Sequence, residues 1–280
     1  MKRIAQTFCP ASISLMFGAV YKKDPLQTGS VGIGFTVNKK IEVRIQRAQQ
    51  TSIVFNGKKI IFSTVQTVLD TLVPKEHVKV EISSPLPLGF GFGISGAAAL
   101  TTASAISNLY KLGKSKEELV QIAHTAEIVN RTGLGTVGTQ ILGGFLLKTA
   151  AGLPVRAVSF PFVGQNIYAV VIKRLPTESV LNNKNKTAKI NLAAEKALEK
   201  IKKLIKPSLE GIIDIAYSYA IESSLVSNQA VANVIGKIKQ HGGHATMAMV
   251  GQTVVSTIDP TKLTGFAVQK LKISNNNMVL

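Results

Sequence analysis

Residues 85–100 constrain the fold more than any other segment of this chain. They read Pro-Leu-Pro-Leu-Gly-Phe-Gly-Phe-Gly-Ile-Ser-Gly-Ala-Ala-Ala-Leu. A β-branched run at 78–82 precedes them and predicts a strand, and the small, apolar residues from Ser95 onward predict a buried helix. A strand, a glycine-rich loop and a helix N-terminus together form an anion site, because backbone N–H groups converge there and the helix adds partial positive charge. We therefore expect this segment to bind a phosphate group.

Composition limits the classes of protein that the chain could belong to. The 280 residues are 45% hydrophobic and 17% charged, which allows one large domain or two moderate ones and excludes a disordered chain. No run of about twenty apolar residues occurs, so we expect no membrane contact. The short basic start is not followed by a long apolar region, which favours a cytoplasmic protein. The single cysteine, Cys9, excludes an internal disulfide and a cysteine metal cage.

The formal net charge of +18 raises the question of a nucleic-acid partner. Lysine supplies most of this charge, whereas arginine is the usual residue for bidentate contacts to phosphates or bases. The lysines crowd into 184–206, where Glu195 and Glu199 are interspersed with them. We interpret this segment as a solvated lysine face, with attraction of anionic metabolites as an alternative, and we expect no specific nucleic-acid partner.

Strands and helices are predicted in an irregular mixture, which indicates an α+β fold. Turns are expected at 38–40 and, more strongly, at Asn56-Gly57, because Asn-Gly favours the hairpin turn that matches strand twist. Residues 115–118 fit a capping box at the start of a helix. The polar residues 175–190 predict a loop, and 192–205 predict an amphipathic helix.

The glycine-rich segment resembles the phosphate-binding motif Pro-x-x-x-Gly-Leu-Gly-Ser-Ser-Ala-Ala of the GHMP kinases, which are named for galactokinase, homoserine, mevalonate and phosphomevalonate kinases. That family phosphorylates small metabolites with ATP and Mg²⁺. The resemblance implies that ATP contacts the residues of this motif. They are Pro87, Gly89, Gly91, Phe92, Gly93, Ile94, Ser95, Gly96 and Ala97. Ile94 stands where the motif has its first serine, which removes one polar contact.

Segments along nearly the whole chain resemble one branch of this family, the archaeal pantoate kinases of coenzyme A biosynthesis. These segments are 9–14, 28–34, 123–127, 132–135 and 242–251. The resemblance implies an ATP-dependent kinase that converts pantoate to 4-phosphopantoate. Two alternatives stay open. One is a GHMP kinase for another small alcohol, such as mevalonate or homoserine, and the other is a catalytically degenerate homologue that only binds nucleotide.

The resemblance also assigns catalytic roles. Ser95 and Glu127 match the residues that hold magnesium, which prefers oxygen ligands. The family often has an aspartate that activates the acceptor where this chain has Thr136, and a threonine cannot take a proton at neutral pH. Either positioning and charge supply most of the catalysis, as a loose phosphoryl-transfer transition state allows, or another carboxylate serves. Asp24 is the candidate for that role, with a turn residue before proline as the simpler interpretation.

A substrate that carries a carboxylate needs a cation, and Arg131 is the predicted partner because arginine binds carboxylates in a bidentate manner. Hydroxyl groups at Ser12, Ser14, Ser30 and Thr132 are candidate substrate contacts. His244 and Thr246 are expected to border the substrate or the phosphate end, and a plain buried strand is the alternative for that segment.

The fold that the resemblance implies has two α+β lobes with the active site between them. An N-terminal lobe at 1–162 would carry the sheet, its helices and the glycine loop, and a ferredoxin-like C-terminal lobe would occupy 163–280. The expected partner is a small-molecule substrate. The sequence leaves the oligomeric state open, with a homodimer among the options.

Overall fold

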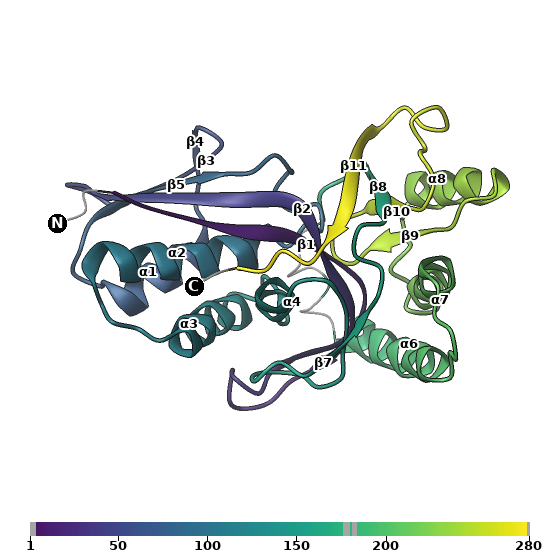
Figure 1. Cartoon of the computed structure of the whole chain (residues 1–280), viewed down its shortest axis with the longest axis horizontal. Helices are drawn as coiled ribbons and strands as arrows, with labels where there is room; N and C mark the ends of the chain where they lie inside the picture. Colours follow the sequence, from purple (N-terminus) through teal and green to yellow (C-terminus); the bar gives the residue numbers. More distant parts are fainter. Residues whose placement is uncertain (1–3, 176–179, 181–183, 279–280) are drawn as a thin grey trace.

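A computed structural model of the chain describes residues 4–175, 180 and 184–278, and it confirms the α+β class (Figure 1). The strands are β1 (Ile4–Val20), β2 (Gly29–Arg47), β3 (Ser52–Phe55), β4 (Lys58–Lys59), β5 (Val78–Ser83), β6 (Phe145–Lys148), β7 (Ala157–Phe160), β8 (Asn166–Val171), β9 (Ala245–Ala248), β10 (Thr253–Ser256) and β11 (Ala267–Ser274). The helices are α1 (Ser63–Leu72), α2 (Ile94–Tyr110), α3 (Lys116–Val129), α4 (Thr136–Leu142), α6 (Lys184–Lys202), α7 (Leu209–Glu222) and α8 (Gln229–Gln240).

The strands form one hydrogen-bonded sheet system that runs through the described chain. Its main path is β4-β3-β5-β2-β11-β8-β10-β9, and β1 and β6 also pair with β2. The β3–β5 pair is parallel, and the other pairs are antiparallel. Because β11 pairs with both β2 and β8, it links the N-terminal strands to the C-terminal ones.

The expected turn at 38–40 is wrong, because β2 continues through these residues. β1 pairs with β2 on both sides of these residues, Pro10 with Lys40 and Ser12 with Thr36, so they form a register shift within a continuous strand. The Asn38 side chain accepts a hydrogen bond from the Lys272 N–H instead of closing a turn. The turn at Asn56-Gly57 is confirmed, and both of its residues have positive φ angles, 46° and 80°.

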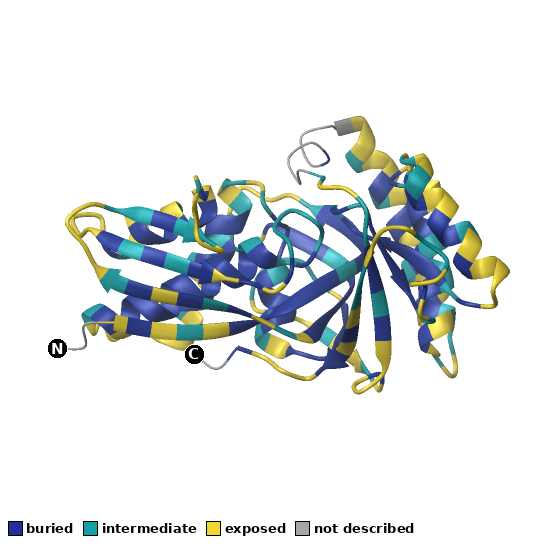
Figure 2. Cartoon of the chain, turned by 90° about the horizontal axis from the view of Figure 1, so that it is seen from above, coloured by how far each residue is buried: buried dark blue, intermediate teal, exposed yellow. Residues whose placement is uncertain are grey.

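The helices α1, α2 and α3 lie on one face of the N-terminal strands, and no helix of the described chain covers the other face (Figure 1). α2 is buried along most of its length, as its small, apolar sequence predicts. The capping box that begins α3 is confirmed, because Ser115 Oγ accepts from the Glu118 N–H and the Glu118 carboxylate accepts from the Ser115 N–H. Buried and exposed residues alternate along the strands on the open face (Figure 2), a pattern expected of a sheet with one solvated face.

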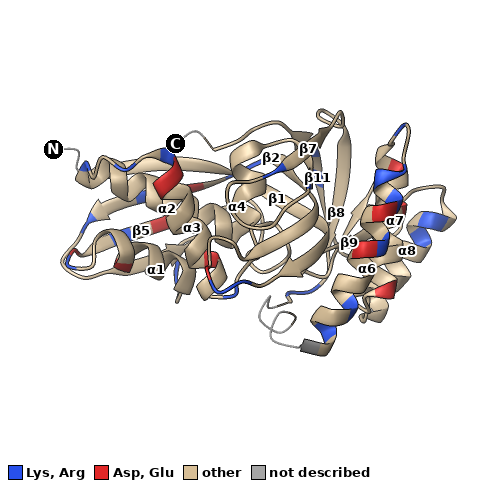
Figure 3. Ribbon diagram, turned by 90° about the horizontal axis from the view of Figure 1, so that it is seen from below, with Lys and Arg blue, Asp and Glu red and all other residues tan. Residues whose placement is uncertain are grey.

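The C-terminal strands carry α6, α7 and α8. α6 begins at Lys184, earlier than the sequence predicts, so the predicted loop at 175–190 is wrong for 184–190, while 176–179 and 181–183 lie outside the described residues. Apolar residues such as Ala193, Ala197 and Ile201 are buried, which fixes the rotation of the helix. Lysines along its described part are exposed together with Glu195 and Glu199 (Figure 3), which confirms the solvated lysine face; they are Lys186, Lys189, Lys196, Lys200 and Lys202. Within the described part of the chain, no helix is both long and apolar enough to cross a membrane.

Candidate active site

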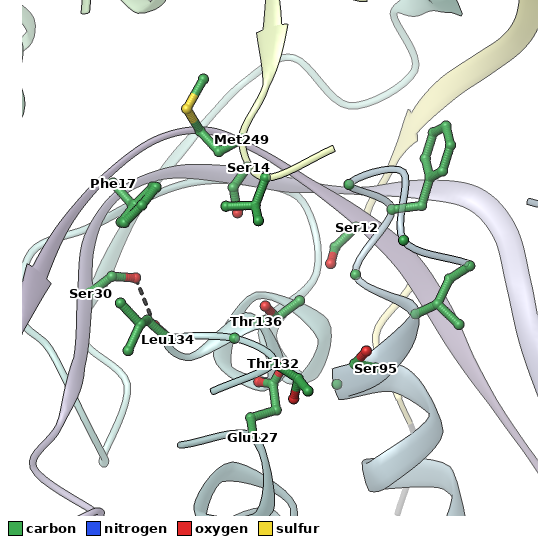
Figure 4. Close-up of a pocket in the computed structure, with 18 of the residues that line it drawn as sticks. Ser12, Ser14, Phe17, Ser30, Ser95, Glu127, Thr132, Leu134, Thr136 and Met249 are labelled. Atoms are coloured by element: carbon green, nitrogen blue, oxygen red, sulfur yellow. Dashed lines mark hydrogen bonds between the residues drawn. The ribbon is translucent and has the colours of Figure 1, made fainter. Parts of the chain in front are cut away.

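A cavity opens where β1 and β2, the glycine loop and the starts of α2 and α4 meet (Figure 4). The register between β1 and β2 shifts between Pro10 and Ser12 and again between Ser14 and Met16. Ser12 and Ser14 lie in the regular stretch between these shifts, where residues two apart point to the same face of a strand. Both hydroxyl groups therefore line the cavity.

Most of the predicted site residues come together in this one cavity, although they come from four regions of the sequence. Those that line it are Ser12, Ser14, Ser30, Gly89, Gly91, Phe92, Gly93, Ile94, Ser95, Gly96, Glu127, Thr132 and Thr136. Pro87, Asp24, Ala97, Arg131, His244 and Thr246 are not among its lining residues. The placement supports the predicted grouping, while the individual roles stay predictions.

The glycine loop ends in a helix N-terminus that faces the cavity. Gly93 is the N-cap of α2, has a φ of 65° and makes no side-chain cap, so the first N–H groups of the helix are not satisfied by a capping side chain. A Cβ on Gly93 would meet Ser12 Oγ and would lie 2.8 Å from Thr136 Cγ2. Only glycine combines this backbone conformation with this close approach. The result is an anion cradle at the start of a 17-residue helix.

Glu127 brings a buried carboxylate to the wall of the cavity. Its side chain is 1% exposed, and Oε2 accepts a hydrogen bond of 3.2 Å from the Val137 N–H. Burial raises its pKa to about 7, although the Val137 N–H, the Lys148 charge and Thr136 oppose the rise. Oε1 has no hydrogen-bond partner among the described residues. An unpartnered buried carboxylate oxygen fits a hard cation such as Mg²⁺.

Lys148 is a buried cation in the same cavity, and the sequence analysis did not identify it. Its Nζ donates to Ser30 Oγ at 3.0 Å and to the Gly135 carbonyl at 3.1 Å. An ammonium group has three donors, so one remains for a ligand in the cavity. Burial lowers the pKa of Lys148 to about 8, and the charge of Glu127 opposes this change. The sequence does carry a signal for this residue, because Lys148 ends the otherwise apolar strand Phe145–Lys148.

Thr136 is the first residue of α4, and its side chain lies next to that of Glu127. The Cβ position of Gly133 is 3.0 Å from Thr136 Oγ1 and also contacts Glu127 Oε1, so the two side chains share one small space. Thr132 lines the same wall, and its hydroxyl exchanges a hydrogen bond of 2.8 Å with Thr64 at the start of α1. Thr136, which stands where the resemblance implies an aspartate, therefore brings a hydroxyl close to the buried carboxylate.

Two candidate residues lie in other surroundings. Asp24 accepts a hydrogen bond from the Leu26 N–H in the turn before β2, as a turn residue does. The His244 Nδ1 pairs with Asp214 at 2.7 Å, and this pair joins the start of β9 to α7. Within the described residues, Met249 and Val250, at the opposite end of β9 from His244, line the cavity in place of the predicted segment.

The C-terminal part of the chain rests directly on the glycine loop. Thr253 Oγ1 donates to the Phe90 carbonyl at 2.7 Å, and a Cβ on Gly251 would overlap the Phe90 and Gly91 backbone. The Met249 N–H donates to the Ser14 carbonyl at 2.8 Å, which connects the same segment to β1. The cavity is thus closed by residues that are more than a hundred positions apart in the sequence.

Comparison with known proteins agrees with this geometry. Residues 59–144 match the model of the GHMP kinases N terminal domain. The chain is similar to the pantoate kinase of Methanocaldococcus jannaschii, with 28% identity over 88% of this chain and 90% of that protein. It is also similar to the pantoate kinase of Thermococcus kodakarensis, with 29% identity over 91% and 88% of the two chains.

A solved structure described as a phosphotransferase related to the CoA biosynthesis pathway has the same fold. It superposes with a TM-score of 0.85 at 24% identity and covers 99% of this chain and 98% of its own. The matched domain contains the glycine loop, Glu127 and Thr136, which are among the residues that line the cavity. The chain belongs to the GHMP kinase superfamily.

Proposed function

We propose that this protein is a pantoate kinase, which transfers the terminal phosphoryl group of ATP to the primary hydroxyl of pantoate and forms 4-phosphopantoate. The observation that carries this proposal is that an uncapped helix N-terminus, a buried carboxylate and a buried ammonium share one cavity. The first suits a phosphate, the second a magnesium ion, and the third a carboxylate acceptor. The similarity to two pantoate kinases over most of the chain supports the same substrate.

The triphosphate of ATP is proposed to lie against the glycine loop, with its terminal phosphate at the start of α2. Glu127 Oε1 and the Ser95 hydroxyl would hold Mg²⁺, since one is an unpartnered buried oxygen and both line the cavity. Bound there, Mg²⁺ neutralises phosphate charge. Their shared place in the lining of the cavity supports these proposed roles of Ser95 and Glu127.

The carboxylate of pantoate is proposed to pair with Lys148, with Ser30 beside it. Lys148 is 8% exposed and lines the cavity, whereas the predicted partner Arg131 is exposed and is not among the lining residues. In the transfer, the hydroxyl oxygen of pantoate forms a bond to the γ-phosphorus while the bond to the β,γ-bridging oxygen breaks. ADP leaves with that electron pair, and the hydroxyl proton passes to solvent. A loose transition state allows positioning and charge to carry this step beside Thr136.

The division of the chain into two lobes, its cellular compartment and its oligomeric state are also proposals. An N-terminal lobe at 1–162 and a ferredoxin-like lobe at 163–280 would enclose the site, which is consistent with the contact of Thr253 with the glycine loop. Such an enzyme of small-molecule metabolism would act in the cytoplasm, as a monomer or a homodimer.

One observation favours a second candidate function, a homologue that binds nucleotide without transferring phosphate. Thr136 cannot accept a proton, and the structure places no other carboxylate beside Glu127 among the residues that line the cavity. This candidate predicts ATP binding without a phosphorylated product. It also predicts that Thr136→Asp gains activity.

A coupled assay of ADP release tests the proposal, with pantoate, mevalonate and homoserine as acceptors in the presence of Mg²⁺. We expect turnover with pantoate that greatly exceeds turnover with the other two. Preference for mevalonate or homoserine would assign a different substrate within the superfamily. No turnover with any acceptor, together with no binding of ATP, would overturn the kinase proposal.

A further inference from the structure

Gln140 is a fully buried side chain on α4 that joins two walls of the cavity. It is 0% exposed, and its Nε2 donates to the Gly93 carbonyl at 2.8 Å and to Ser12 Oγ at 3.2 Å. Gly93 is the N-cap of α2, and Ser12 lies on β1. One amide group therefore connects the glycine loop to the strand on the opposite wall.

The orientation of this amide is determined by its partners. The Gly93 carbonyl can only accept a hydrogen bond, so the nitrogen of Gln140 must face it. A reversed amide would place two acceptors against each other. Gln140 therefore presents an N–H donor to Ser12 as well.

Ser12 is left with a proton to donate, because its oxygen accepts from Gln140 and a hydroxyl carries one donor of its own. Among the hydrogen bonds of the described residues, Ser12 Oγ donates to none. The side chain is 3% exposed and lines the cavity, and Figure 4 shows its oxygen directed into the space that Ser95 and Thr136 also face. The Ser12 N–H donates to the Phe92 carbonyl at 3.1 Å, which fixes the strand against the loop.

The hydroxyl of Ser12 lies at the phosphate end of the cavity. Ser12 Oγ contacts the point that a Cβ on Gly93 would occupy, next to the first turn of α2. A phosphate at this helix start would meet backbone N–H groups on one side and Ser12 on the other. In phosphoryl transfer, charge is spread over the three non-bridging oxygens, so a preorganised donor there stabilises the transition state.

We propose that Ser12 is a catalytic residue that donates its hydroxyl proton in a hydrogen bond to a non-bridging oxygen of the γ-phosphate, and that Gln140 is the positioning residue that directs this donor. The inference rests on the proposed kinase function. It assigns Ser12 to the transferred phosphate, whereas the sequence analysis grouped it with the hydroxyls that contact the acceptor.

The test compares nucleotides with and without the γ-phosphate by calorimetry, in the presence of Mg²⁺. The probes are ADP and a non-hydrolysable ATP analogue with a β,γ-methylene bridge. For Ser12→Ala, we expect affinity for the analogue to fall about tenfold or more, since hydrogen bonds to charged groups are strong, while affinity for ADP stays within about twofold. The kcat should fall and the KM for the acceptor should change little.

Thr7→Ala is the matched control, because Thr7 lies on the same strand and carries a hydroxyl that donates to the Thr101 carbonyl away from the cavity. Its affinities for ADP and for the analogue should both stay within about twofold of those of the unaltered protein. A fall in analogue affinity of the same size as in Ser12→Ala would overturn the specific assignment of Ser12.

Gln140→Met tests the positioning role, since methionine has a similar length and no donor. It should lower the ratio of analogue affinity to ADP affinity, and in a Ser12→Ala background it should lower that ratio no further. Loss of the Gln140 bond to Gly93 would weaken the binding of both nucleotides and leave their ratio unchanged. A change in the ratio therefore reports on the positioning of Ser12. If Gln140→Met does not fold, Gln140→Asn withdraws the same donor and gives the same comparison.

The outcomes distinguish this inference from the proposed function. If Ser12→Ala raises only the acceptor KM, or if the two substitutions act additively on the ratio, the inference is wrong although the kinase proposal stands. If the unaltered protein binds neither nucleotide, the proposed function itself fails.

Discussion

Two buried groups of opposite charge, Glu127 and Lys148, define the chemistry of the cavity at the scale of single residues. Burial raises the pKa of the first to about 7 and lowers that of the second to about 8, so the folded protein disfavours the charged form of both. Such groups cost stability unless a ligand compensates them, and perturbed groups that gather in a cleft are typical of functional sites. Bound Mg²⁺ and a bound carboxylate would provide that compensation.

The raised pKa of Glu127 makes a prediction about stability without any substrate. The folded protein holds this proton more tightly than the unfolded chain, so stability is lost as the pH rises from about 4.5 through about 7. Glu127→Gln removes that loss, so its stability relative to the unaltered protein should increase by roughly 3 kcal/mol between about pH 5 and about pH 8. Urea unfolding in the presence of a chelator measures this difference.

Glu117→Gln is the control, because Glu117 lies in the first turn of the same helix and is exposed. It should show no comparable gain toward alkaline pH. A Glu127→Gln variant that gains nothing with rising pH would show that the carboxylate is not held in a desolvated site.

Lys148 makes a separate prediction about the acceptor. Lys148→Met should lower kcat/KM for pantoate by about a hundredfold, as the loss of a buried charged hydrogen bond does, and leave the affinity for ADP within about twofold. Lys200→Met on the exposed face of α6 removes a charge without touching the cavity and should change neither value. Equal losses in both variants would indicate a general effect of net charge and contradict the assignment.

At the scale of elements, the start of α2 determines how an anion can be held. Sequence reasoning predicts this helix and its glycine loop because both are local patterns, and the capping box of α3 was predictable for the same reason. The uninterrupted course of β2 was not predictable, because pairing with β1 and the contact of Asn38 with Lys272 overrode a local turn preference. Lys148 was missed for a similar reason, since its burial depends on Ser30 and Gly135.

Gly93→Ala tests the geometry of this element. The new Cβ would meet Ser12 Oγ at a residue whose φ is 65°, so we expect a loss of roughly 2 kcal/mol in stability and the loss of measurable ATP binding. Thermal unfolding and calorimetry measure the two effects. Gly236→Ala, inside α8 with open space around its Cβ position, should instead gain about 0.5–1 kcal/mol and keep ATP binding. Tolerance of alanine at position 93 would contradict the described loop.

At the scale of the whole molecule, the C-terminal segment is seated on the N-terminal glycine loop and contributes Met249 and Val250 to the cavity wall. In the segment from Met249 to Thr253, the Met249 N–H donates to the Ser14 carbonyl of β1 and the Thr253 hydroxyl donates to the Phe90 carbonyl of the glycine loop. The sequence predicts that the substrate lies near His244 and Thr246, a few residues before the segment that lines the cavity. The pattern of a single strand does not show which end of that strand meets a distant loop. That information lies in long-range packing.

Gly251→Ala therefore tests whether the packing of this segment against the glycine loop is needed for ATP binding. Its Cβ would overlap the backbone of Phe90 and Gly91, so the glycine loop must shift and ATP affinity should fall by at least tenfold. Gly265→Ala, whose Cβ position contacts nothing within 4 Å, should leave ATP affinity unchanged. Calorimetry with ATP in the presence of Mg²⁺ measures both, and equal affinities for the two variants would contradict the close seating of the segment.

The central claim is that this cavity transfers phosphate from ATP to pantoate, and following the γ-phosphate itself tests it most directly. The protein is incubated with pantoate, Mg²⁺ and ATP that carries a label on the γ-phosphate, and the labelled products are identified by mass spectrometry. We predict that the label appears as a phosphomonoester on the primary hydroxyl of pantoate, and that a chelator abolishes its formation. Label that stays in ATP while the protein binds that nucleotide would contradict the claim.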